Sequence, residues 1–188
     1  MPKKQQITKE MILQAALDVV RENGAEALGT RAVARKLGVS TQPIFSQFAS
    51  IDELGEATYA EAVALYNRKT EEAMKCSDRP YRAAGLAYID FARREPQLFR
   101  WLFMRDRSKN PTDDPTQLEP FLAILQTTLG LSHDDALLFY LEMWTVVHGI
   151  ATMVATAYFD WNEETLSRVL TDFYFGLQSR FAKEDPAQ

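Results

Sequence analysis

The chain has 188 residues, of which 46% are hydrophobic and 25% charged, and its formal net charge is −5. This length supports a small domain and a larger one, each with its own core. The single cysteine, Cys76, excludes an internal disulfide and is typical of a reducing compartment. The basic start, MPKKQQ, is followed by an amphipathic segment, so we expect no secretory signal.

The first predicted helix carries an apolar stripe at helical spacing and closes at a glycine. Asn23-Gly24 ends this helix with a residue suited to a positive φ. The stripe comprises Ile12, Ala15, Ala16, Val19 and Val20.

The segment 30–54 predicts two short helices that meet at a fixed turn, followed by a third helix. Ala34 allows the first two helices to approach closely, Gly38 can end the first, and Ile44 anchors the second from beneath. We expect Ser40 to cap the second helix, with Pro43 tolerated in its first turn. This is the layout of a helix-turn-helix, although a helix pair that only packs would share the spacing.

Short polar side chains remain on the outer face of the second helix, where they can reach base edges in a major groove. These side chains are Thr41, Gln42, Ser46 and Gln47. Ser50 and Glu53 form a capping box that opens the third helix.

The charge is distributed unevenly along the chain. Seven lysines and arginines against four acids give the first 48 residues a net charge of +3, which leaves −8 for the remainder. A positive head on an acidic body suits phosphate contact at one end. Lys3 and Lys4 are either a flexible arm that reaches DNA or a solvated terminus.

At these residues the chain resembles the TetR/AcrR family of bacterial transcription regulators. The matching pattern covers roughly residues 8 to 54 and includes Thr30-Arg31-x-Val33-Ala34, Leu37-Gly38-Val39-Ser40, Ile44-Phe45-x-x-Phe48 and Asp52-Glu53-Leu54. The resemblance implies a homodimer that binds a palindromic double-stranded DNA operator, and a repressor that a small-molecule effector releases.

Two positions depart from the family pattern. The family usually has Tyr at Phe45 and Lys at Ile51, and both commonly contact phosphates. We therefore leave Ile51 out of the DNA interface and treat Phe45 as a packing contact at the groove edge. The predicted DNA-binding residues are Thr30 and Arg31 on phosphates, Thr41 and Gln42 on bases, and Pro43, Phe45, Ser46 and Gln47 beside them.

Beyond Leu54 the helical rhythm continues without hairpin signals, which predicts an all-α protein. We expect a helix-turn-helix DNA-binding domain at residues 1–54 and a larger helical ligand-binding and dimerisation domain at 55–188. Predicted helices span about 51–75, 77–95, 97–104, 116–129, 133–158 and 163–183, with a loop at 105–115. Ser132 and Asn162 are the expected caps of the last two. The apolar run 146–159 is too short to cross a bilayer and is interpreted as a buried helix.

A second resemblance lies in this larger domain. Trp144-Thr-Val-Val-His148-Gly149 is similar to the Trp-x-x-x-His-Gly signature of one C-terminal class in the same family. Gly149 within a helix suggests close approach by a helix or a ligand. We expect an effector pocket, although the same aromatic residues suit a plain core. Its predicted lining is Phe91, Phe99, Phe103, Phe121, Tyr140, Trp144 and His148.

The last predicted helix carries an apolar stripe wider than one packing face needs, with Gly176 available for a close crossing. The resemblance implies a four-helix bundle with a second subunit, and reading an inverted repeat also requires two recognition helices. The stripe comprises Leu166, Val169, Leu170, Phe173, Tyr174, Leu177 and Phe181.

No pattern predicts catalysis. The chain has two histidines and lacks a P-loop, a dinucleotide turn, a paired-cysteine motif and a zincin helix, so we expect no enzyme, cofactor or metal site. We expect a cytoplasmic regulator without membrane attachment. The alternative is a helical small-molecule-binding or partner-binding protein with weakened DNA affinity, which the departures at Phe45 and Ile51 favour.

Overall fold

The computed structural model describes residues 7–105 and 118–182, and within these ranges the chain is all-α, as predicted. It separates into two compact units. We call the described parts of residues 1–69 and 94–105 the head unit, and those of 70–93 and 106–188 the body unit. The division falls inside the long helix α4 (Ile51–Lys75), after Lys69. The domain boundary placed after Leu54 from sequence motifs stays a prediction.

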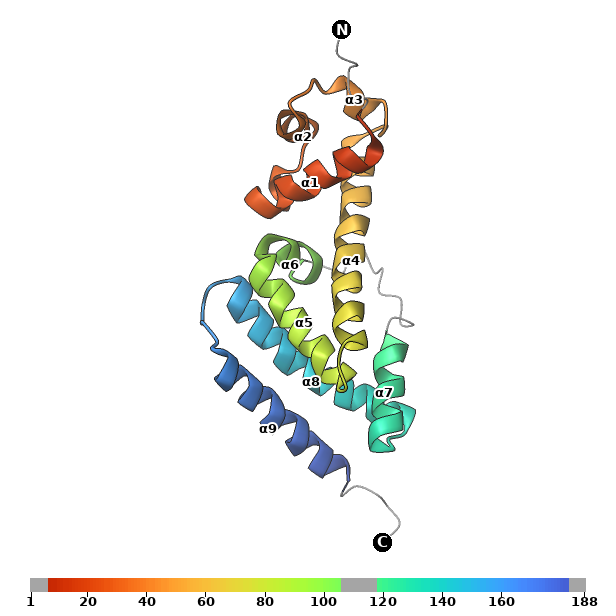
Figure 1. The fold of residues 1–188 in the computed structure, drawn as a ribbon, viewed down its shortest axis with the longest axis vertical. Coiled ribbons are helices and arrows are strands. Elements are labelled where there is room, and N and C mark those ends of the chain that lie inside the picture. The colour runs from red at the N-terminus through yellow and green to blue at the C-terminus, as the bar shows by residue number, and fades with distance from the viewer. Residues whose placement is uncertain (1–6, 106–117, 183–188) are drawn as a thin grey trace. The chain divides into compact units, whose positions relative to one another are not determined.

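The head unit contains α1 (Lys9–Asn23), the 3-10 helix η1 (Ala25–Ala27), α2 (Thr30–Leu37), α3 (Gln42–Phe45) and α6 (Pro96–Phe103). In this unit α1, α2 and α3 lie around the start of α4, and α6 lies further along it (Figure 1). Helix α6, distant in sequence, packs against α1 and η1. The predicted α1 stripe supplies much of the core, whose buried residues are Ile12, Ala15, Ala16, Val19, Val33, Ala34, Ile44, Phe48 and Leu54.

Of the predicted helix ends in the head unit, those at Gly24, Gly38 and Ser50 are confirmed, whereas the cap at Ser40 is not. Gly24 ends α1 at a φ of 86°. The Ser50 hydroxyl accepts from the Glu53 amide at 3.1 Å and so caps α4, but the Glu53 carboxylate accepts at 2.6 Å from the amide of Ala49, one residue before the amide that a capping box would use. Ser40 does not cap α3, because the N-cap residue is Thr41, whose side chain makes no capping hydrogen bond.

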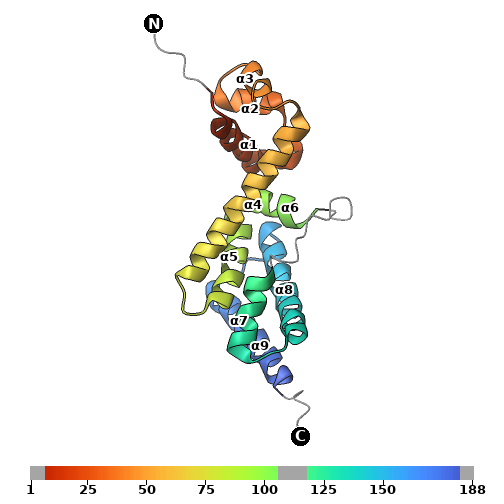
Figure 2. The same ribbon diagram turned by 90° about the vertical axis from the view of Figure 1, so that its right-hand side faces the viewer.

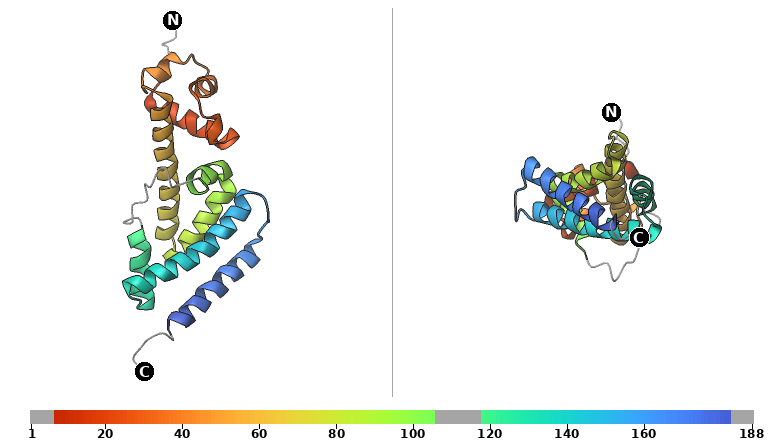
Figure 3. Two further views of the ribbon diagram at one scale, coloured as in Figure 1. Left: turned by 180° about the vertical axis from the view of Figure 1, so that it is seen from behind. Right: turned by 90° about the horizontal axis from the view of Figure 1, so that it is seen from below.

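The body unit is built from the end of α4, nearly all of α5 (Pro80–Arg94), and α7 (Glu119–Leu129), α8 (His133–Ala155) and α9 (Glu163–Phe181). Helix α8 packs against both α7 and α9, and the views in Figure 2 and Figure 3 show α9 running beside it. Gly85 on α5 faces Val147 on α8, where an added Cβ would lie 3.5 Å from a valine methyl. The core here comprises Leu122, Leu125, Ala136, Phe139, Met143 and Phe181.

Helix ends in the body follow local signals, with one clear departure. The Ser132 and Asn162 caps are confirmed, since their side chains accept from the Asp135 and Thr165 amides. Helix α8, however, ends at Ala155 rather than at 158, and the next residue but one, Ala157, has a φ of 53°. This left-handed residue turns the chain out of the helix.

The helical interpretation of 146–159 is therefore wrong for its last four residues, and Tyr158 is 81% exposed. Helix α4 has the predicted bounds, while α5 and α6 begin and end within three residues of theirs. Most of the predicted loop at 105–115, the first two residues of the helix predicted at 116–129 and the last residue of the helix predicted at 163–183 lie outside the described ranges. Lys3 and Lys4 also lie outside them.

Among the described helices, α8 alone is long and apolar enough by composition to cross a bilayer, with a mean hydropathy of 1.5 over an 18-residue window. Residues 146–155 of the apolar run considered from sequence are only the second part of this helix, whose start at His133 was predicted. A core helix of a globular protein meets the same criterion, so the finding by itself is weak support for a membrane span.

Candidate nucleic-acid interface

The turn between α2 and α3 is held by a glycine in the left-handed conformation. Gly38 has a φ of 68° and a ψ of 30°, and its amide donates to the Arg35 carbonyl at 3.2 Å. The following amide, of Val39, donates to the Ala34 carbonyl at 3.0 Å. Two carbonyls at the end of α2 are thereby satisfied, which sets the direction in which the chain enters α3.

Helix α3 is a single turn with one buried and one exposed side. Ile44 and, just beyond the helix, Phe48 are buried at 0% and 1% exposure, and they anchor the segment to the head core. Gln42, Phe45 and Gln47 are exposed. The predicted outward face is therefore present, and α1, α2 and α4 supply the core on which it rests.

Pro43 explains why α3 needs no side-chain cap. It occupies the second helical position and has no N–H to satisfy. The amides of Ile44 and Phe45 both donate to the Thr41 backbone carbonyl, at 3.1 and 3.2 Å. The Thr41 carbonyl thus accepts hydrogen bonds from amides of the first turn, which is the role predicted for the Ser40 hydroxyl.

The polar residues of this face differ in whether their side-chain hydrogen-bonding groups are already used within the protein. The Ser46 hydroxyl donates to the Pro43 carbonyl at 2.7 Å, so its proton is already used within the helix. Gln42 and Gln47 make no side-chain hydrogen bond within the described ranges, which leaves both amide groups able to donate and accept. Thr41 is half-buried beside them.

The start of α2 offers a second polar edge. Its N-cap is Gly29, which has no side chain to accept from the first-turn amides. Thr30 is half-buried and Arg31 is exposed at this end. Backbone N–H groups, a hydroxyl and a guanidinium at a helix N-terminus are suited to a phosphate group.

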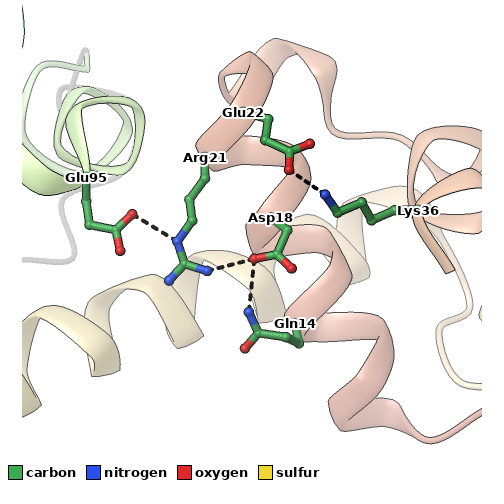
Figure 4. A network of polar contacts seen from close by, with 6 residues as sticks. All are labelled: Gln14, Asp18, Arg21, Glu22, Lys36 and Glu95. Atoms are coloured by element: carbon green, nitrogen blue, oxygen red, sulfur yellow. Dashed lines mark hydrogen bonds and ion pairs between the residues drawn. The ribbon is translucent and has the colours of Figure 1, made fainter.

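Ion pairs within the head unit neutralise some of the positive charge counted from the sequence (Figure 4). Lys36 on α2 pairs with Glu22 on α1. Arg21 donates to Glu95 at 2.9 Å and to Asp18 at 2.8 Å, linking α1 to the residue that precedes α6. Burial acts to lower the pKa of Arg21, but the hydrogen bond and charge of Glu95, followed by those of Asp18, raise it overall.

Three other cations counted in the first 48 residues are able to meet phosphates. Within the described ranges Arg31, Arg35 and Lys9 form no ion pair, and the Lys9 ammonium lies 5.0 Å from the centre of the Phe48 ring. Arg31 and Arg35 are both exposed and four residues apart, so they share one face of α2. Arg35 was not among the predicted contacts, although its spacing from Arg31 was readable in the sequence.

Comparison with protein families matches both parts of this architecture. Residues 12–58 match the model described as bacterial regulatory proteins, tetR family, and residues 81–173 match the tetracyclin repressor-like C-terminal domain. The chain belongs to the TetR family. This places it among DNA-binding transcription regulators rather than among enzymes. The narrower Trp-x-x-x-His-Gly class of the C-terminal domain stays a prediction.

Solved structures share the TetR fold at low sequence identity. A TetR-like transcriptional regulator from Rhodococcus sp. RHA1 is 15% identical, with a TM-score of 0.66 over 93% of this chain and 96% of that one. A TetR family protein from Vibrio parahaemolyticus is 14% identical, with a TM-score of 0.59 over 89% and 96%. No curated protein matches the chain.

The seven aromatic residues predicted to line an effector pocket lie in both units. Phe99 and Phe103 belong to the head unit and contact each other, with ring centroids 5.2 Å apart. The other five belong to the body unit, where Phe121 contacts Tyr140 at 5.7 Å and Phe91 is buried. Because the seven residues are divided between the two units, their grouping around one effector pocket stays a prediction.

Within the body unit the Trp-x-x-x-His spacing produces a ring stack. The Trp144 and His148 rings are 4.7 Å apart and 11° from parallel. The His148 Nδ1 is also 2.9 Å from the hydroxyl of Tyr88, a buried residue of α5. Tyr88 was missed from sequence because nothing local connects positions 60 residues apart. Thr152, one turn after His148, has a buried hydroxyl with no partner in the described ranges.

Helices α8 and α9 leave large apolar side chains in solvent. Of the stripe predicted on α9, Leu166, Leu170 and Phe181 are buried in the body unit, whereas Phe173 is 50% exposed. Added Cβ atoms at Gly149 and Gly176 would meet nothing within 4 Å, so neither glycine serves a close approach by another described residue. The exposed apolar residues are Leu138, Leu141, Trp144, Phe173 and Phe175.

Proposed function

We propose that this TetR-family chain is a cytoplasmic homodimeric repressor that binds a palindromic operator and releases it when a small molecule enters the body unit. The observation that carries the proposal is helix α3, anchored by Ile44 and Phe48 with the unbonded amides of Gln42 and Gln47 exposed. Such amides pair with adenine edges in the major groove.

Phosphate contacts would come from one face and one end of α2. Arg31 and Arg35 lack acidic partners in the described ranges, and Thr30 lies at the open N-terminus. Contacts of this kind orient a protein on DNA without reading sequence. In this proposal Thr41 and Gln42 read bases, and Pro43, Phe45, Ser46 and Gln47 complete the groove surface.

Two arguments support a dimer. One recognition helix reads only a few base pairs, whereas a two-fold pair reads an inverted repeat. The apolar side chains exposed on α8 and α9 also provide a surface that a second subunit would cover. The open glycines at 149 and 176 leave room there for close approach of a partner helix.

For the effector, the body unit offers a set of aromatic and polar groups on α5 and α8. The half-exposed Trp144 and His148 rings stack, His148 is bonded to Tyr88, and the buried Thr152 hydroxyl is without a partner in the described ranges. A ligand that satisfies Thr152 would gain a hydrogen bond at a group already removed from water. Release of DNA requires that this ligand bind more tightly to a state that binds DNA poorly.

The test is salt-dependent binding of the full chain to DNA flanking its own gene. Each phosphate contact contributes about 0.9 to the slope of log K against log salt concentration. Arg31→Ala should therefore make the slope of a dimer shallower by about 1.8, and Arg35→Ala likewise. The control is Arg168→Ala, an exposed arginine of α9 in the body unit, which should leave the slope unchanged.

The outcomes separate the proposal from its alternative. Sequence-selective binding with the two shallower slopes supports a repressor, and compounds that release this DNA identify the effector. A chain that binds no flanking DNA selectively, yet binds a small molecule or another protein, would be the regulator with weakened DNA affinity that Phe45 and Ile51 favour.

A further inference from the structure

Phe45 is an apolar side chain that the head unit leaves 54% exposed on the DNA-reading helix. Its neighbour Ile44 is fully buried, and so is Phe48 three residues later, so the core is already anchored without it. Gln42 lies three residues before Phe45 and shares its side of the helix turn. The phenyl ring therefore belongs to the surface that meets the base edges.

The chemistry of the ring limits what it can recognise there. A phenyl group neither donates nor accepts a conventional hydrogen bond, so it gains little from phosphate oxygens or from the amide and carbonyl edges of bases. The C5-methyl of thymine is the apolar group that a base pair presents in the major groove, and phenylalanine is among the side chains that contact it. Cytosine has a hydrogen at the same position.

We propose that Phe45 packs against a thymine C5-methyl in each operator half-site and is a specificity-determining residue. The proposal rests on the operator binding proposed above. The Gln42 and Gln47 amides would flank this contact and read the neighbouring polar edges, so one helix turn combines hydrogen-bond and methyl recognition. An aromatic ring exposed in the free protein is then covered in the complex, which accounts for its presence on a hydrophilic face.

The experiment replaces thymine by deoxyuridine, which removes the methyl group and keeps every hydrogen-bonding group. An operator is first selected with the full-length chain from random double-stranded DNA. Each thymine of one half-site is then replaced in turn, and binding is measured by fluorescence anisotropy. Burial of one methyl group corresponds to about a fourfold change in affinity, so replacement at the contacted position should weaken binding about fourfold, or about 15-fold in both half-sites.

Two variants assign the effect to the ring. With Phe45→Ala, the thymine and deoxyuridine operators should bind equally well, because no ring remains to contact the methyl group. Ile51→Ala removes another large apolar side chain exposed in the head unit, 39% exposed at the start of α4, and should retain the fourfold difference. Both positions are exposed, and thermal unfolding checks that each variant is folded.

Distinct outcomes overturn distinct statements. If an operator is selected but no deoxyuridine replacement weakens wild-type binding, or if the penalty persists in Phe45→Ala, the methyl contact is wrong while operator binding stands. If the wild-type chain selects no sequence at all, operator binding itself fails and the contact with it.

Discussion

The ion-pair network around Arg21 should contribute measurably to the stability of the head unit. The Arg21 side chain is 28% exposed and Glu95 only 16%, and their atoms are 2.9 Å apart. Gln14 donates to the same Asp18 oxygen that accepts from Arg21, so the acid is held in place. Changing Arg21 to Met keeps most of the apolar stem and removes the charge.

The magnitude follows from the burial of the two partners. A hydrogen bond to a charged group contributes about 1.5–3 kcal/mol, whereas an exposed ion pair contributes about 0.2–1 kcal/mol. The Glu95 pair lies nearer the first case and the Asp18 pair nearer the second, so Arg21→Met should cost about 2 kcal/mol. For a chain of this length that corresponds to a fall of about 4–8 °C in Tm.

A double-mutant cycle is the appropriate assay, because it isolates the Arg21–Glu95 term from other effects of each change. Thermal and urea unfolding would be measured for Arg21→Met, Glu95→Gln and the double variant. We expect a coupling of about 1–1.5 kcal/mol. Arg168 and Asp172, an exposed pair on α9, serve as the matched control, with a coupling below about 0.5 kcal/mol. A coupling for Arg21 and Glu95 no larger than that of the control would refute the reasoning.

Two further changes test the turn and the body core. Gly38→Ala places a residue with a Cβ in the left-handed region, where the Cβ meets no described atom within 4 Å, so it should lower the free energy of unfolding by about 1–2 kcal/mol through the backbone alone. Gly38→Asn should lower it less, because asparagine tolerates this conformation. Equal losses for the two variants would contradict the backbone explanation. Tyr81 packs against Phe139 and Tyr174, and its pKa is raised first by burial and then by the nearby phenol groups of Tyr140 and Tyr174. Because folding favours its neutral form, stability should be complete below about pH 10 and fall as the pH rises beyond it. Tyr81→Phe should reduce this alkaline loss in urea titrations at pH 8 and pH 10.5, and an unchanged loss would exclude Tyr81 as its source.

Much of the head interface was predictable because its determinants are local. A glycine that must end α2, a proline that fits the first turn of α3 and a serine that caps α4 each act on groups no more than five residues away along the chain. The spacing of Ile44 and Phe48 then decides which side of α3 is buried. The prediction that Ser40 caps α3 failed for a local reason too. The Thr41 backbone carbonyl accepts hydrogen bonds from first-turn amides, and the sequence does not show whether a carbonyl or a hydroxyl is the acceptor.

The charge count shows where sequence stops being sufficient. Composition indicated a positive head, but a sum cannot show that Lys36 is paired with Glu22, or that Arg21 meets Glu95 across 74 residues. Which cations remain for phosphates depends on how α1 packs against α2 and α6. The same holds for His148, whose spacing from Trp144 was visible in the sequence and whose bond to Tyr88 was not.

The sequence by itself thus determined the all-α class, most helix ends and the outward polar face of α3, because helix periodicity, caps and turn conformations depend on neighbouring residues. Only the tertiary structure decided that α6 packs in the head unit, that Arg31 and Arg35 lack acidic partners in the described ranges, and that Phe45 is left in solvent. These features depend on contacts between segments far apart in the chain, and such contacts leave no periodic trace in the sequence.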